Sequence, residues 1–132
     1  MFRILAHQMS WFVEKGRRHF VSRLVGLLEA SYPDSIEGMT REEITAWVDA
    51  AVAKAAFYGI ETEPEVTQLV LLFLVLDIDV DLNEPWAREI LADPDLVPIG
   101  KVRALVEEAR ERGISSVDVV VRSELLGEAV DA

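Results

Sequence analysis

The chain has 132 residues, no cysteine and a formal net charge of −11. The length suits one domain, the lack of cysteine excludes disulfides and thiolate sites, and the acidic balance argues against nucleic acid and anionic membranes as partners. The longest apolar run, residues 69–76, is too short to cross a bilayer. No stretch resembles a secretory signal. We therefore expect no membrane span and a cytoplasmic location.

The first predicted helix runs from about Ser10 to Ser31. Its apolar residues recur at three- and four-residue spacing, as on one face of a helix; they are Trp11, Phe12, Phe20, Val21, Leu24, Leu27 and Leu28. Residues 1–30 hold five basic and two acidic side chains, a net charge of +3, so residues 31–132 carry −14. The basic residues either form a contact face for a partner or pair with the acidic remainder.

The second predicted helix opens with a capping box. Thr40 precedes Glu43 by three residues, and each side chain can bond the backbone N–H of the other. Gly59 suits the left-handed position that ends such a helix. The alanines between these ends leave little bulk, so another helix can approach closely.

The third predicted helix covers residues 63–78. Thr62 and Glu65 repeat the capping pattern. The helix is apolar on nearly every side, which is typical of a helix buried all round. We expect it at the centre of the domain, or facing a second copy of the chain in a homodimer.

Oxygen-bearing side chains follow this helix at alternate positions: Asp77, Asp79, Asp81 and Asn83. A calcium loop starting at Asp77 would need glycine at position 6 and glutamate at position 12, where Leu82 and Arg88 stand. We interpret the stretch as a helix exit and a packed connection. A metal site made by Asp77, Asp79 and Asp81 is the alternative.

In this connection the apolar residues between the acidic ones are expected to be buried: Ile78, Val80 and Leu82. The aspartates are expected to face water, or Asp81 and Asn83 to cap the next helix. That helix starts at Pro85 and ends before Pro94.

A last helix is predicted from Pro98 to Gly113. Residues 114–132 alternate like a strand at first and then read as a weak helix, so we expect a short helix or a partly ordered tail. The sequence thus predicts an all-α, compact single-domain bundle of about five helices over residues 1–113.

Chemistry-bearing patterns are sparse. His7 and His19 lie twelve residues apart, more than three helical turns, and no glycine-rich phosphate loop occurs. We therefore expect neither an enzyme nor a cofactor. The candidates for contact with a protein partner are basic and aromatic: Arg17, Arg18, Arg23, Trp11 and Trp86. For the tryptophans, the alternative is a role as core or boundary anchors.

Several motifs together resemble a known family. They are Arg18, Phe20, Leu24 and Pro33 in the first helix, "YGI" with Thr62 and Glu65, and D-x-D followed by "WAREILADPDL". This order resembles a family of small helical bacterial proteins encoded beside spike-tip, adaptor and toxin genes in type VI secretion and polymorphic-toxin clusters.

The resemblance covers about Trp11 to Leu105. The apolar residues between the aspartates, and the tail beyond Gly113, depart from the family pattern. The resemblance implies a cytoplasmic accessory protein that handles an effector, or an immunity protein that neutralises a cognate toxin. It implies no catalytic residues.

Overall fold

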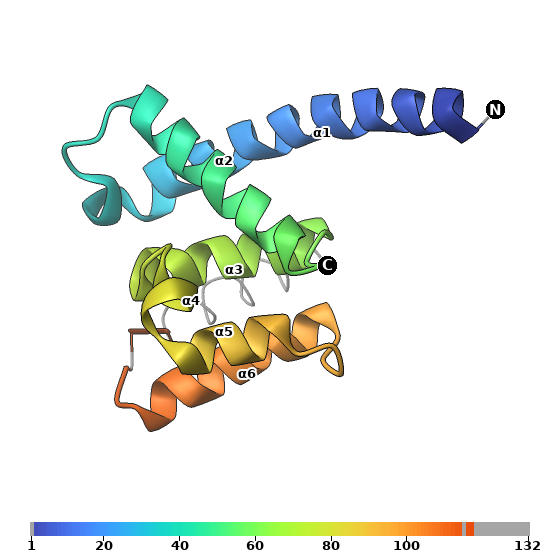
Figure 1. Cartoon of the computed structure of the whole chain (residues 1–132). Coiled ribbons are helices and arrows are strands. Elements are labelled where there is room, and N and C mark those ends of the chain that lie inside the picture. Colours follow the sequence, from blue (N-terminus) through green and yellow to red (C-terminus); the bar gives the residue numbers. More distant parts are fainter. Residues whose placement is uncertain (1, 115, 118–132) are drawn as a thin grey trace, which may run out of the picture. The chain divides into compact units, whose positions relative to one another are not determined.

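The computed structural model describes the backbone of residues 2–114 and 116–117, and side chains from Gly16 onward. Within these residues the chain is all-helical, without a strand (Figure 1). The elements are α1 (Phe2–Ser31), the 3-10 helix η1 (Pro33–Ile36), α2 (Arg41–Phe57), α3 (Glu63–Leu76), α4 (Val80–Asn83), α5 (Pro85–Ala92) and α6 (Pro98–Glu111). The predicted all-α fold is confirmed.

Two boundaries differ from the prediction. Helix α1 begins at Phe2 rather than near Ser10; residues 2–9 contain neither proline nor glycine, so nothing in the local sequence interrupts the helix. Helix α3 ends at Leu76, two residues early, and the short α4 follows it. None of the described helices is long and apolar enough to span a membrane.

The chain divides at Ala50 and Ala51 into an N-terminal unit and a C-terminal unit, and this boundary lies within α2. In the N-terminal unit, η1 packs on α1. The described part of the predicted apolar face of α1 is buried, apart from the half-buried Leu27: Phe20, Val21, Leu24 and Leu28.

In the C-terminal unit, α6 packs on both α3 and α5, and α5 packs on α4. Six consecutive residues of α3, Gln68 to Phe73, are buried, as predicted for a helix that is apolar all round. Gln68 is the polar exception, and its Oε1 has no hydrogen-bond partner among the described residues. Dimerisation through α3 stays a prediction.

Most residues that were predicted to begin or end a helix do so. At the start of α2, the Thr40 N–H donates to Glu43 Oε1 (3.0 Å) and the Glu43 N–H donates to Thr40 Oγ1 (3.1 Å), which completes the capping box. Gly59 and Gly113 follow α2 and α6 with positive φ, 79° and 84°. In each case the next N–H bonds back to a carbonyl five residues earlier.

The second predicted capping box is wrong. Thr62 occupies the N-cap position of α3, but its side chain makes no capping hydrogen bond. Pro64, the second residue of the helix, has no N–H, so one of the two usual donors to an N-cap side chain is absent; the other donor, the Glu65 N–H, is not bonded by Thr62 either.

The division into a domain of residues 1–113 and a tail of 114–132 stays a prediction. Of the tail, the structure describes residues 114, 116 and 117, and Val117 is fully buried. The rest of the predicted tail lies outside the described residues.

Candidate functional site

The alternating acidic stretch after α3 is only partly as predicted. Asp77 and Asp79 are exposed, but Asp81 is buried, with 3% of its surface accessible. Capping of α5 by Asp81 or Asn83 is wrong, because Glu84 holds the N-cap position and no side chain caps it. The stretch coils into α4 instead.

The expected burial of the intervening residues is partly wrong for the same reason. Val80 is buried and Ile78 half-buried, but Leu82 is 69% exposed. In an extended segment, residues 78, 80 and 82 would share one face. In a helical turn, neighbouring positions 80 and 81 face inward together while 82 faces water.

Asp81 lies at the centre of a polar cluster with Lys54 and Tyr58, here called the Asp81 cluster. Lys54 Nζ donates to Asp81 Oδ1 (2.7 Å), and the Tyr58 hydroxyl donates to Asp81 Oδ2 (2.5 Å). The same Nζ donates to the Ile78 carbonyl (2.8 Å) and lies 3.6 Å from Asp79 Oδ1. The cluster fastens the end of α2 to the segment after α3.

The pKa values of Asp81 and Tyr58, the two acidic groups of the cluster, are shifted in opposite directions. Burial alone would raise the pKa of Asp81, but hydrogen bonds from Lys54 and Tyr58 outweigh it and lower the pKa of this carboxyl. Burial and the hydrogen bond to Asp81 raise the pKa of Tyr58 to about 12. Both shifts favour the ionised carboxylate beside a neutral phenol.

These contacts give the acidic stretch a structural role. The Lys54 ammonium contacts two carboxylate oxygens and one carbonyl oxygen. Such oxygen atoms are also the usual ligands of Ca²⁺, so the positive charge of Lys54 stands where a bound cation would. Among the described residues, no group of three or more His, Cys, Asp or Glu side chains is placed to hold a metal ion.

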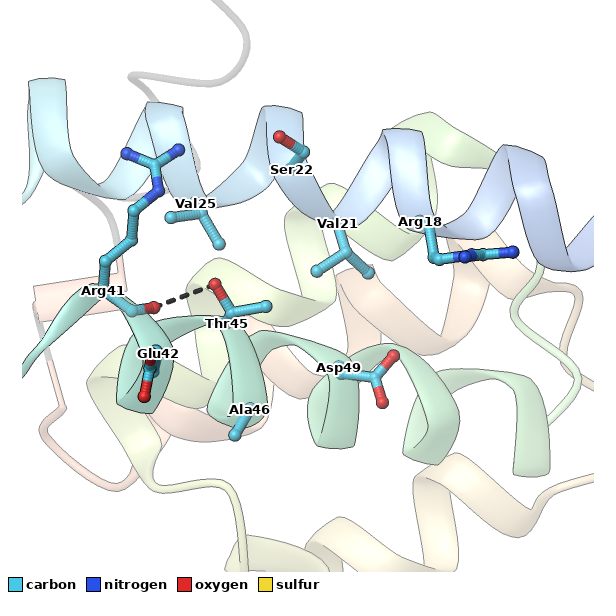
Figure 2. Close-up of a pocket in the computed structure, with 9 residues that line it drawn as sticks. All are labelled: Arg18, Val21, Ser22, Val25, Arg41, Glu42, Thr45, Ala46 and Asp49. Carbon is cyan, nitrogen blue, oxygen red and sulfur yellow. Dashed lines mark hydrogen bonds between the residues drawn. The ribbon is translucent and has the colours of Figure 1, made fainter.

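An open groove lies along α1 and the first half of α2 in the N-terminal unit (Figure 2). Its volume is about 800 Å³. The side chains of Val21 and Val25 point from α1 toward α2 and give it an apolar floor, and Ala46 is the apolar lining residue of α2. The remaining lining residues are polar or charged: Arg18, Ser22, Arg41, Glu42, Thr45 and Asp49.

Two ion pairs join α1 to α2 beside this groove. Arg17 Nε donates to Asp49 Oδ1 (3.2 Å), and its Nη2 donates to the Asp49 carbonyl (3.1 Å). Arg41 Nη1 donates to Glu29 Oε1 (2.7 Å). The Thr45 hydroxyl donates to the Arg41 carbonyl (2.8 Å), so it is satisfied within α2.

Two charged lining residues are left over. Arg18 and Glu42 are exposed, and neither makes a hydrogen bond or ion pair with another side chain in the described part of the chain. They lie at opposite ends of the groove, Arg18 near Asp49 and Glu42 near Arg41 (Figure 2). The groove thus has an apolar middle and an exposed charge at each end, positive at Arg18 and negative at Glu42.

The structure does not bring the predicted partner-binding residues that it describes together at one site. Arg18 lines the groove and Arg17 pairs beside it. The Arg23 guanidinium lies 5.6 Å from the centroid of the Phe20 ring. Trp86, in the C-terminal unit, is half-buried with the Arg112 guanidinium 5.0 Å from its ring centroid. The side chain of Trp11 lies outside the described residues.

Sequence reasoning missed the α2 side of the groove and the basic member of the Asp81 cluster. Lys54 had a local signal, because it is the single charged residue in "AAVAKAAF". Arg41, Glu42 and Asp49 had none beyond their place on the polar side of a helix. Their relation to α1 depends on how the two helices align.

The chain was compared with protein families, curated proteins and solved structures. No protein family matches it, and no curated protein or solved structure is significantly similar to it. The family resemblance therefore rests on the quoted motifs.

Proposed function

We propose that this chain is a non-enzymatic interaction protein that binds a protein partner through the groove of its N-terminal unit. The groove itself carries the proposal: it has a volume of about 800 Å³, an apolar floor and two exposed charges that pair with no other side chain in the described part of the chain. An apolar centre with polar rims is how protein-binding surfaces are commonly built. The proposed partner is a secreted effector of the type VI class or part of its loading apparatus.

Two further observations support this assignment. The motifs from Trp11 to Leu105 resemble proteins encoded beside secretion and toxin genes, which indicates the class of partner. The charge is also polarised, with +3 on residues 1–30 and −14 on residues 31–132. Such asymmetry orients an approaching partner and speeds its association.

Co-purification with the products of neighbouring genes tests the proposal. We expect one product to co-purify with the tagged wild-type chain. Ala46→Arg, which places a long side chain in the groove, should reduce the recovered partner about tenfold, equivalent to about 1.4 kcal/mol. Ala53→Arg is the matched control, because Ala53 is also exposed on α2 but does not line the groove.

The outcomes are distinct. If the wild-type chain retains none of the neighbouring products, the accessory function is wrong. If Ala46→Arg and Ala53→Arg retain a product equally well, the groove is not its binding site.

A second function is favoured by the acidic charge of residues 31–132. An acidic surface can cover the basic active site of a toxin, as expected of an immunity protein. Co-expression with the adjacent toxin gene tests this role. Growth of the cells supports neutralisation, and their death contradicts it.

A further inference from the structure

We infer that the groove receives an amphipathic helix of the partner, with a carboxylate at the Arg18 end and a basic side chain at the Glu42 end. This inference rests on the proposed function and specifies the chemistry of the partner. Three features of the groove support it: the length, the apolar floor, and the exposed charges of Arg18 and Glu42 at the two ends.

The dimensions fit about two turns of helix. The lining residues span positions 18–25 on α1 and 41–49 on α2. At 1.5 Å per residue, these stretches are about 10–12 Å long. A helix lying along the groove would direct its residues i, i+3, i+4 and i+7 into it. The middle positions would cover the floor, and the outer ones would reach the charged ends.

The charges select a ligand with two opposite charges. Of the four charged lining residues, Arg41 is paired with Glu29 and Asp49 with Arg17. Arg18 and Glu42, of opposite sign and at opposite ends, have no side-chain partner among the residues that the structure describes. A small anion or cation would be attracted at one end and repelled at the other. A helix with an acid and a base about two turns apart satisfies both.

The walls are held before a ligand arrives. One ion pair joins α1 to α2 near each end of the groove, Arg17–Asp49 at one and Glu29–Arg41 at the other. Exposed pairs add little stability, but they restrict the orientation of the side chains around the opening. A preorganised groove loses less entropy when a helix binds.

A second copy of the chain fits the groove less well. The net charge of −11 makes two copies repel each other.

Selection from a displayed library of helical peptides tests the inference. The bait is the full chain, immobilised at random sites. We expect enriched peptides to carry one acidic and one basic residue about seven positions apart, with apolar residues between them. Arg18→Glu should weaken such a peptide about tenfold, and replacing the acidic residue of the peptide by lysine should restore binding.

Arg103→Glu is the matched control, since it makes the same charge change at an exposed arginine of α6. Its affinity for the peptide should equal that of the wild type. The inference is overturned if no helical pattern is enriched, if Arg18→Glu and Arg103→Glu bind alike, or if light scattering shows a dimer that Arg18→Glu dissociates. If Ala46→Arg abolishes binding of the partner but Arg18→Glu does not weaken it, the proposed function is supported and the inferred helical ligand is wrong.

Discussion

At the scale of single residues, Asp81 decides how the end of α2 is held to the segment after α3. Its carboxylate is 3% exposed and accepts hydrogen bonds from both Lys54 and Tyr58. A buried carboxylate is tolerated when such partners replace the water it loses. The Lys101 ammonium adds a hydrogen bond from α6 to the Tyr58 carbonyl (2.8 Å), so α6 is also joined to the end of α2 beside this cluster.

Replacing Asp81 by asparagine should therefore destabilise the fold. The change removes the charge that compensates Lys54 and weakens two charge-assisted hydrogen bonds. We expect the free energy of unfolding to fall by about 2–4 kcal/mol in urea titrations near pH 7. Asp79→Asn is the control, since Asp79 is exposed and 3.6 Å from Lys54, and it should change stability by less than about 1 kcal/mol. Equal losses in the two variants would contradict this role of Asp81.

The pH dependence follows from the lowered pKa of Asp81. A lowered folded-state pKa stabilises the fold above the ordinary value of 3.8, and this contribution is lost as the pH falls through the folded-state value. The difference in stability between the wild type and Asp81→Asn should therefore narrow below about pH 4. A difference that stays constant down to pH 2 would argue against the shift.

Tyr58 gives the corresponding prediction at high pH. Its pKa is raised from 10.0 to about 12, so its contribution is complete below pH 10 and is lost between pH 10 and 12. Ultraviolet titration of tyrosinate should resolve a group with a pKa of about 12 that is absent in Tyr58→Phe. The unfolding free energy of the wild type should fall over the same interval. If Tyr58 titrates near pH 10, its bond to Asp81 is not maintained in solution.

At the scale of elements, the two threonine caps form a natural comparison. Thr40 exchanges two hydrogen bonds with Glu43, whereas the Thr62 side chain makes no capping bond. Thr40→Ala should lower the free energy of unfolding by about 1 kcal/mol, measured by chemical denaturation. Thr62→Ala should lower it by less than about half as much. The reverse order would mean that the capping geometry in solution differs at both helices.

The capping box also affects a titratable group. The backbone and side-chain hydrogen bonds with Thr40 lower the pKa of Glu43. Since a carboxylate accepts these bonds better than a carboxylic acid does, Thr40 and the ionised Glu43 support each other. The same sequence pattern at Thr62 and Glu65 lacks this exchange, which shows that spacing alone does not complete a capping box.

At the scale of the whole molecule, the net charge of −11 opposes compaction. Added salt screens this repulsion within about 10 Å at 0.1 M. We expect the melting temperature, followed by circular dichroism, to rise by roughly 2–4 °C between low salt and 0.15 M sodium chloride. A lower melting temperature with salt would mean that ion pairs such as Arg17–Asp49 outweigh the overall repulsion.

Much of the fold could be predicted from sequence because its signals are local. The apolar face of α1, the capping box at Thr40, and the turns at Gly59 and Gly113 depend on residues no more than about six positions apart. The structure confirms each of them where it describes the residues. The extra helical turn at Val80–Asn83 could not be predicted, since four residues hold too little periodicity to separate a turn of helix from an extended segment.

From the sequence alone follow the helical fold, the acidic net charge and the burial of a strongly apolar third helix. Tertiary structure decided which polar residues meet. Asp81 is 27 residues from Lys54 and 23 from Tyr58, so no periodic pattern links them. The groove likewise combines α1 with α2, and its open charges, Arg18 and Glu42, acquire meaning once these helices are aligned. The physical reason is that helix caps, helical backbone hydrogen bonds and periodicity involve residues close together in the chain, whereas the pairing of these side chains depends on packing between distant segments.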